Sequence, residues 1–346
     1  MKWYEDTKSG THDVVISSRI RLARNLENYP FGSRLVKEQA EKLTNEVKKG
    51  FFQQSDTAKQ YFDFINVNSV TNLDKTALME RHAISPMFIN KETATGMILS
   101  KDESISIMIN EEDHVRIQCI VQGMNIEKTL EEANKLDDLL DSYLHYAFDD
   151  NYGYLTSCPT NLGTGLRASY MIHVPALEST GKLRFILDAI GKFGITVRGI
   201  YGEGTQGEGS VFQISNQITL GQSEEEIIEN LNSITNQIVE QERLLRNNLI
   251  KEKRYQLEDS IYRAYGILTN ARVLTSKEAM TFLSDIKIGM ELGIFELEEK
   301  KKLNIYELMM AIQPANLQKN THKFLNDDDR DIERAKYIRE NLPKIK

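Results

Sequence analysis

Five arginines stand beside predicted turns or at the ends of predicted strands, where binding sites are usually built. They are Arg19, Arg21, Arg116, Arg167 and Arg198. An arginine fork matches phosphate oxygens in a bidentate manner, so a set of five predicts a polyphosphate site. Each arginine alone is more often a surface ion-pair partner. Only their shared context favours a common anion site.

Two carboxylates and one thiol accompany these arginines. Glu112 lies in the charged turn 110–114, and Glu203 stands between glycines in the loop 202–209. Glu112 alone is best read as a solvated turn residue, whereas the flanking glycines of Glu203 allow a close approach. Cys158 begins a run that ends at Arg167 and contains one proline and two glycines. Such a loop brings backbone N–H groups close to an anion, although a cysteine before proline is also an ordinary buried residue.

Familiar phosphate and metal motifs are missing. The sequence has no Walker lysine loop and no protein-kinase HRD or DFG motif. The glycines of 202–207 match the dinucleotide spacing, but a strand is expected after them, so a pyrophosphate would lack a helix N-terminus. The acidic run 327–329 lacks the glycine and distal glutamate of a calcium loop. We therefore expect no protein metal site.

The composition is that of a soluble globular protein large enough for two domains. The chain has 346 residues, 40% apolar and 27% charged, with a formal net charge of −8. An acidic chain is a poor general nucleic-acid binder. Two cysteines far apart indicate neither a disulfide framework nor a CxxC site. No leader-like or membrane-spanning run is present, so we expect a cytoplasmic protein without membrane or direct nucleic-acid contacts.

Hydrophobic periodicity predicts an α+β part followed by helices. Two-residue alternation over 95–121 indicates antiparallel strands. Further strands are expected over 12–16, 168–174, 195–201 and 211–220, and helices over 36–52, 73–83, 126–148, 183–193 and 224–253. Helices alone are expected over 258–272, 276–291, 303–312 and 328–341. The predicted fold is an antiparallel sheet flanked by helices over 1–253, followed by a smaller all-α domain over 254–346.

Five ordered motifs resemble those of the ATP:guanido phosphotransferase (phosphagen kinase) family. They are Ser17-Ser18-Arg19-Ile20-Arg21, the turn from Asn110 to Arg116, Cys158-Pro159-Thr160-Asn161-Leu162-Gly163, Arg167-Ala168-Ser169, and Arg198-Gly199-Ile200-Tyr201-Gly202-Glu203. They span about 12–250.

Two departures make the chain similar to the bacterial protein arginine kinases of that family. Creatine and arginine kinases carry a helical domain before the first motif, and we expect that domain to be absent because the motif begins at Ser17. The C-terminal part contains Arg330-Asp331-Ile332-Glu333-Arg334-Ala335, which resembles a phosphoarginine-binding motif. Tyr201 stands where metabolite kinases have a second arginine, so one phosphate contact is lost or supplied by another group.

The resemblance implies roles for individual residues. The ATP-binding set would be Ser17, Ser18, Arg19, Ile20, Arg21, His82, Arg116, Arg167, Ala168, Ser169, Tyr170, Met171, Arg198, Gly199, Ile200, Tyr201 and Gly202. Glu112 and Glu203 would hold the substrate guanidinium, with Cys158 nearby in a supporting role. Arg330, Asp331 and Arg334 would bind phosphoarginine. Mg²⁺ would accompany ATP.

A guanidinium is a difficult phosphoryl acceptor, because its nitrogen has no free lone pair while protonated. Lowering a pKa of about 13.8 to neutrality would cost on the order of 9 kcal/mol. We therefore expect the two carboxylates to orient the guanidinium and accept its proton as the P–N bond forms. Glu112 is the expected main base and Glu203 mainly orients.

The resulting hypothesis is an ATP-dependent kinase of arginine side chains in proteins. The resemblance implies stress regulation, Clp-type degradation of marked substrates, a Clp unfoldase, a heat-shock repressor and a zinc-binding activator as partners, and a homodimer. A kinase of free arginine or another small guanidino metabolite is the first alternative. A non-catalytic phosphoarginine-binding adaptor is the second.

Overall fold

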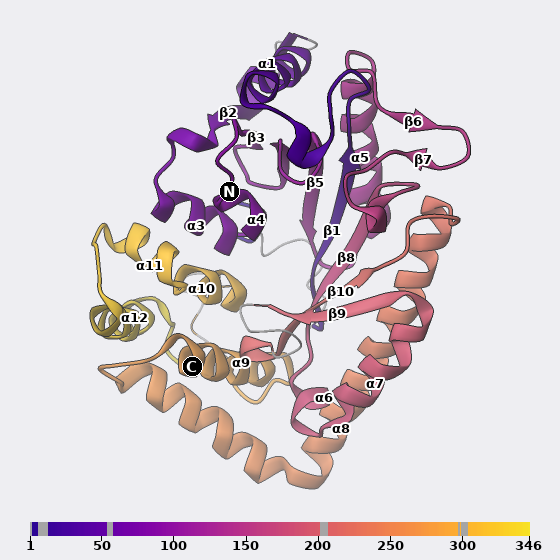
Figure 1. Ribbon diagram of the computed structural model, residues 1–346. Coiled ribbons are helices and arrows are strands. Elements are labelled where there is room, and N and C mark those ends of the chain that lie inside the picture. The colour runs from indigo at the N-terminus through magenta and orange to yellow at the C-terminus, as the bar shows by residue number, and fades with distance from the viewer. Residues whose placement is uncertain (1, 6–12, 54–57, 201–206, 297, 299–303) are drawn as a thin grey trace. The chain divides into compact units, whose positions relative to one another are not determined.

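The computed structural model describes residues 2–5, 13–53, 58–200, 207–296, 298 and 304–346. An eight-stranded sheet has the order β2-β3-β4-β5-β1-β8-β10-β9, and β6 pairs with β7 (Figure 1). The chain forms two compact units. Unit 1 comprises residues 1–3, 17–170 and 215–232, and unit 2 comprises 4–16, 171–214 and 233–346.

Most strands are short. Antiparallel pairing joins β1 to β5, β2 to β3, β3 to β4, β4 to β5 and β6 to β7. Their bounds are β1 (Val15–Arg24), β2 (Phe62–Asn66), β3 (Gly96–Ser100), β4 (Ile105–Ile109), β5 (Val115–Gln122), β6 (Phe148–Asp149), β7 (Gly153–Tyr154), β8 (Leu166–His173), β9 (Ile195–Gly199) and β10 (Val211–Asn216).

The helices are α1 (Lys37–Gln53), α2 (Ala58–Tyr61), α3 (Asn72–Glu80), α4 (Pro86–Ile89), α5 (Ile126–Asp141), α6 (Pro175–Ser179), α7 (Lys182–Ile190), α8 (Glu224–Asn270), α9 (Ser276–Glu291), α10 (Ile305–Ala311), α11 (Pro314–Thr321) and α12 (Asp327–Asn341). Together with the antiparallel sheet they confirm the predicted α+β class. No described helix is both long and apolar enough to cross a bilayer.

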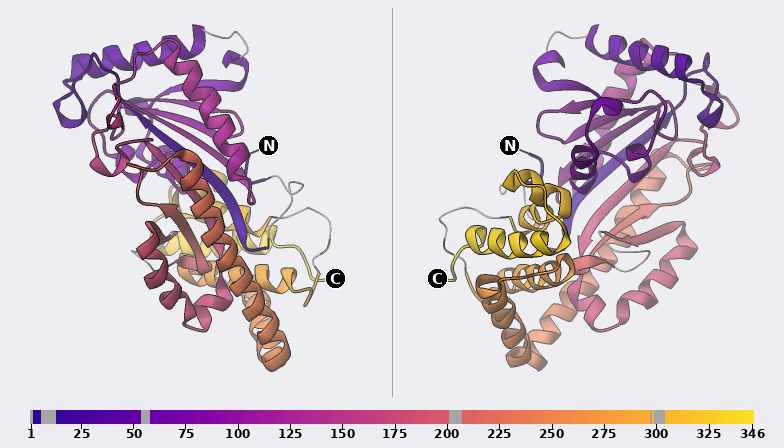
Figure 2. Two further views of the ribbon diagram at one scale, coloured as in Figure 1. Left: turned by 90° about the vertical axis from the view of Figure 1, so that its right-hand side faces the viewer. Right: turned by 60° about the vertical axis from the view of Figure 1, so that its left-hand side comes forward.

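Unit 1 is layered around strands β1 to β5. One face of β3 and β4 packs against α3 and α4 through a buried cluster that includes Phe88, Met97 and Met108. Helix α5 packs against β5, and α1 packs against α5; Figure 2 shows α5, in magenta, lying along the strands. Alternate residues of one strand thus enter different layers.

A buried arginine anchors the loop after β7 in unit 1. Arg24 is 1% exposed and donates to Asp137 of α5 at 2.6 Å. Its guanidinium lies 3.5 Å from the centroid of the Tyr154 ring, and it also donates to the Thr164 carbonyl. A cation buried in this way needs both an anion and hydrogen bonds, and Arg24 has them. We assign it a structural role.

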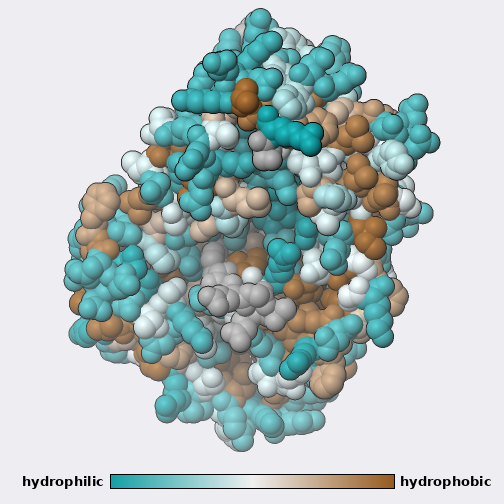
Figure 3. All heavy atoms as spheres, in the orientation of Figure 1, coloured by the Kyte–Doolittle hydropathy of each residue, from teal (hydrophilic) through white to brown (hydrophobic). Residues whose placement is uncertain are grey.

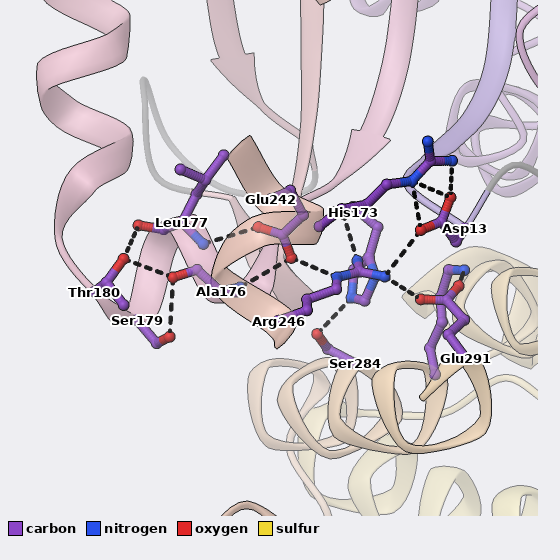
Figure 4. Close-up of polar contacts among 12 residues, drawn as sticks. Asp13, His173, Ala176, Leu177, Ser179, Thr180, Glu242, Arg246, Ser284 and Glu291 are labelled. Atoms are coloured by element: carbon purple, nitrogen blue, oxygen red, sulfur yellow. Dashed lines mark hydrogen bonds and ion pairs between the residues drawn. The ribbon is translucent and has the colours of Figure 1, made fainter. Parts of the chain in front are cut away.

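Unit 2 contains a second buried ion pair, shown in Figure 4. Glu242 and Arg246 of α8 pair at 2.7 Å, and both are almost fully buried. Glu242 accepts from the backbone N–H groups of Ala176 and Leu177, while Arg246 donates to Glu291 of α9 and to the His173 carbonyl. Helices α6, α8 and α9 are therefore fastened together by one charged network.

Several element boundaries differ from the sequence expectation. The helix expected over 126–148 ends at Asp141, because 145–147 instead pairs with the backbone of 25–27. The helix expected to end at 253 continues to Asn270 past one non-helical residue, Lys253. Helix α11 was not predicted, although Pro314 stands at its start, where proline favours a first helical turn.

Candidate active site

Four of the five arginines lie on one face of the sheet in unit 1. Arg19 and Arg21 are two residues apart on β1 and share a side. Arg116 of β5 lies opposite both Ala23 of β1 and Met108 of β4, so it shares that side. Arg19 Nε donates to Ser169 Oγ of β8 at 3.3 Å, and Arg167 precedes Ser169 by two residues. We call Arg19, Arg21, Arg116 and Arg167 together the arginine face.

The positive charges around Arg21 are only partly compensated by nearby carboxylates. Burial, followed by repulsion from Arg19, Arg116 and Arg167, holds the pKa of Arg21 well below its usual value. The buried side-chain atoms without a hydrogen-bond partner include Arg21 Nε and, on the same side of β1, Ser17 Oγ. A bound anion with several oxygen atoms would satisfy both the charge and the unused donors.

The turn after β4 presents one carboxylate and buries another. Glu111 is completely buried and accepts from Arg116 at 2.9 Å, from the Ser85 hydroxyl and from the N–H of Glu112. The Glu112 side chain is 27% exposed and pairs with the second nitrogen of Arg116 at 3.0 Å. Glu111 therefore fixes the turn, and Glu112 carries the accessible carboxylate.

Asp113 joins this turn to the loop that carries Cys158. Its Oδ1 accepts from Asn25 at 2.7 Å and from the backbone N–H of Ser157 at 2.6 Å. The next side chain in the loop, Cys158, is partly exposed, and its Sγ lies 3.1 Å from Thr160 Oγ1. One buried carboxylate thus brings the Cys158 loop to the turn that presents Glu112.

His82 follows α3 with a φ of 64° and stands near the arginine face. Its carbonyl accepts from Gln118 at 2.7 Å, and Gln118 lies opposite Arg21 in the sheet. Burial and the charge of Arg19 lower the pKa of His82 from 6.5 to about 3. The imidazole is therefore neutral near pH 7 and can offer one donor and one acceptor.

The other predicted nucleotide residues have different settings. Ser18 and Ile20 are buried on the side of β1 away from the arginines, and Ser18 Oγ donates to the Gly123 carbonyl. The N–H of Ala168 donates to Asn216. Tyr170 is buried in unit 1, and Met171 is buried in unit 2. Unit 2 also contains Arg198 and Gly199, which end β9, and Ile200, which follows it. Tyr201, Gly202 and Glu203 lie outside the described residues.

The predicted phosphoarginine motif lies on α12 in unit 2. Arg334 is 2% exposed and donates to the carbonyls of Ile312 and Leu274 and to the Asp331 carboxylate. Arg330, by contrast, is about one quarter exposed and pairs with Asp327. Arg334 therefore fixes α12 and Asp331, whereas Arg330 and Asp331 remain accessible.

Sequence reasoning did not single out Glu111 or Asp113, the two buried acids that arrange this site. A run of four charged or titratable residues in one turn marks a cluster, but it does not say which side chain points inward. Arg24 was also missed as a structural cation. Its signal was the odd spacing of Arg19, Arg21 and Arg24, which places Arg24 on the other face of a strand.

Comparison with known proteins places this site in a family. Residues 42–245 match the ATP:guanido phosphotransferase C-terminal catalytic domain, and residues 254–346 match the protein-arginine kinase McsB C-terminal domain. The protein-arginine kinase of Caldanaerobacter subterraneus subsp. tengcongensis is 47% identical over 96% of this chain and 98% of its own. That of Clostridium kluyveri is 44% identical over 98% of both chains.

Solved structures agree on the fold. A duplicated taurocyamine kinase from Schistosoma mansoni is 26% identical, with a TM-score of 0.61 over 75% of this chain. This chain spans 39% of that duplicated protein. Lombricine kinase is 23% identical, with a TM-score of 0.60 over 69% of each chain.

Proposed function

The chain belongs to the protein-arginine kinases of the ATP:guanido phosphotransferase family, and from this we propose that it transfers the γ-phosphoryl group of ATP to arginine side chains of proteins. The observation that carries the proposal is the arginine face beside an accessible carboxylate. Four guanidinium groups gather in unit 1, and Arg116 joins them directly to Glu112.

The arginine face supplies electrostatic stabilisation in this proposal. Arg19, Arg21, Arg116 and Arg167 would hold the triphosphate and the equatorial oxygens of the transferring group, where charge builds up. Because they are already positioned by β1, β5 and β8, little reorganisation is needed as the reaction proceeds. Arg198 and the segment 199–202 would complete the nucleotide site.

Glu112 would act on the acceptor arginine. Its carboxylate would orient the guanidinium and take the proton that leaves the nitrogen as the P–N bond forms and the bond to the β-phosphate oxygen breaks. Glu203 would help to orient the guanidinium, and Cys158 would contact it without forming a covalent intermediate. Arg116, paired with Glu112 at 3.0 Å, would keep that carboxylate aimed at the acceptor.

Magnesium enters as part of the Mg-ATP substrate. In the part of the chain that the structure describes, no group of three or more His, Cys, Asp or Glu side chains is placed to hold a metal. We propose that the phosphates carry Mg²⁺, which neutralises charge on the β- and γ-oxygens.

The C-terminal helices would bind phosphoarginine in our proposal. Asp331 would hold the guanidinium and Arg330 the phosphate, while the buried Arg334 fixes Asp331 in place. Product bound there would change activity or assembly. We assign catalysis to 1–253 and phosphoarginine binding with homodimer formation to 254–346.

The cellular role follows from the family resemblance and remains part of this proposal. A cytoplasmic protein arginine kinase would mark proteins for a Clp unfoldase and protease during stress. A heat-shock repressor would be a substrate, and a zinc-binding protein would be an activator.

Incubation with Mg-ATP and a protein mixture, followed by mass spectrometry under neutral conditions, tests the activity. We expect an acid-labile mass increase of one phosphoryl group on arginine, and none with the Glu112→Gln variant. Phosphorylation of free arginine without any protein product would favour the metabolite-kinase alternative. Retention of full transfer by Glu112→Gln would overturn the role of that carboxylate.

A further inference from the structure

A hollow of about 310 Å³ lies beside the Cys158 loop, entirely within unit 1. Its wall is formed by the β6–β7 hairpin, residues 163–164 and the segment 219–224. None of these residues has a place in the phosphoryl-transfer chemistry proposed above.

Three backbone segments meet closely at its base. A Cβ on Gly153 would lie 2.5 Å from the Gly163 carbonyl, and one on Gly163 would lie 2.5 Å from the Thr219 carbonyl. Both glycines also have positive φ values. Thr219 Oγ1 donates to the carbonyls of Thr160 and Leu162. The hollow is therefore fixed to the Cys158 loop by hydrogen bonds and by contacts that only glycine permits.

Large apolar side chains stand exposed around the hollow. Phe148 and Tyr152 are 55% and 56% exposed, and Ile218 and Leu220 are 49% and 47% exposed. Hydrophobic atoms gather at the upper right of Figure 3, over the region where Figure 1 draws the β6–β7 hairpin. A contiguous exposed patch of this kind usually marks a contact surface.

The charge of the hollow favours a cationic occupant. Among the described residues that line it, Glu224 is the only charged one, and the aromatic side chains are Phe148, Tyr152 and Tyr154. The Arg24 guanidinium already covers the Tyr154 ring, so Phe148 and Tyr152 are the aromatic side chains left for an occupant. Burial raises the pKa of Glu224, so a positive partner would offset the cost of its ionisation. Aromatic faces also attract cations. A carboxylate with aromatic neighbours suits the long alkyl stem and charged end of lysine or arginine.

We propose that this hollow is a docking subsite for the polypeptide that carries the target arginine, and that it takes a basic side chain of that substrate. The proposal rests on the proposed protein-arginine kinase activity. The hollow reaches Gly163, which follows Cys158 by five residues. The distance between these two residues is therefore at most about 18 Å, the length of five extended residues. The preferred basic residue therefore lies within about five positions of the arginine that is phosphorylated.

Paired peptides test this subsite. One peptide carries a single arginine with a lysine three or four residues away, and the other has glutamine in place of that lysine. N-acetylarginine amide serves as an acceptor too small to reach the hollow. KM and kcat are measured for all three acceptors at saturating Mg-ATP, with the full-length chain.

Two substitutions remove the features that the proposal invokes, and each has a matched control. Glu224→Gln removes the charge, with Glu225→Gln on the same helical turn as its control. Tyr152→Ala removes an aromatic wall, with Tyr61→Ala as its control, because Tyr61 is equally exposed at 56%. Neither control residue lines the hollow.

We expect the wild type to prefer the lysine peptide by about three- to fivefold in KM. Glu224→Gln should remove that preference, and Tyr152→Ala should raise KM for both peptides. The controls should retain the wild-type values. An unchanged lysine preference in Glu224→Gln, or an equal loss on N-acetylarginine amide, overturns the docking proposal. Absence of phosphoarginine on every acceptor with the wild type would instead overturn the proposed activity.

Discussion

Replacing Arg21 with glutamine should stabilise the ligand-free protein while weakening nucleotide binding. In the free protein Arg21 is buried among three other arginines, and its pKa is lowered because the charged form is disfavoured. Removing this charge should raise stability by about 1–2 kcal/mol, after allowance for the compensating attraction of Glu111. For a domain of this size, 1 kcal/mol corresponds to about 2–4 °C in Tm.

The effect of nucleotide should be opposite in sign. At one hundred times its Kd, a ligand stabilises the native state by about 2.7 kcal/mol. Loss of a charge-assisted contact to phosphate, worth about 1.5–3 kcal/mol, weakens Kd by roughly ten- to a hundredfold. The same Mg-ATP concentration would then stabilise the variant by only about 0.4–1.4 kcal/mol.

Thermal unfolding with and without Mg-ATP measures both effects, and calorimetric titration gives Kd directly. Arg34→Gln is the control, because Arg34 is an exposed arginine of unit 1 outside the arginine face. The reasoning is refuted by a free Arg21→Gln protein that melts below the wild type, or by one that keeps the full stabilisation by Mg-ATP. Either result would mean that Arg21 is not the centre of a phosphate site with excess positive charge.

Four further substitutions test other parts of the protein. Glu112→Gln should lower kcat by about 10²–10⁴-fold with little change in nucleotide affinity, measured by steady-state kinetics and calorimetry. His82→Asn should make the free energy of unfolding fall less steeply as the pH is lowered, measured by urea unfolding from pH 7 to pH 4. The wild type loses stability as pH falls below 6.5 towards the folded-state pKa near 3, because the unfolded chain takes up the proton first. Arg334→Met should destabilise unit 2 by about 1–3 kcal/mol in urea, since it leaves the carbonyls of Ile312 and Leu274 without their donor, whereas Arg330→Ala should change stability little and weaken phosphoarginine binding in calorimetry.

The sequence alone predicts the periodic elements well and the irregular ones poorly. Alternation of apolar and polar residues over 95–121 predicts β3, β4 and β5, although these strands are buried on both faces over most of their length. Strand β2 was not predicted because it is a short edge strand whose residues are only partly buried or exposed. The β6–β7 hairpin was missed because the predicted helix was extended to Phe148 and because each of the two strands has only two residues.

The candidate site could be predicted in type but not in arrangement. Residue chemistry identifies arginines and carboxylates, and strand parity explains why Arg19 and Arg21 point the same way. The partners of Glu111 and Asp113 depend on residues far away in the chain, such as Ser85 and Ser157. Such contacts follow from tertiary packing and leave no local periodic signal.

The alternation along β1 has a consequence for how the chain can change in length. Arg19 and Arg21 lie on the arginine face, while Arg24 lies on the other side, bound to Asp137. Inserting or deleting a single residue between them would exchange the two faces for part of the strand. Such a change would expose Arg24, the structural cation, or would turn Arg19 or Arg21 from the arginine face into the core. Descendants of this chain should therefore vary in length in loops such as 101–104, while the six-residue interval from Arg19 to Arg24 stays constant.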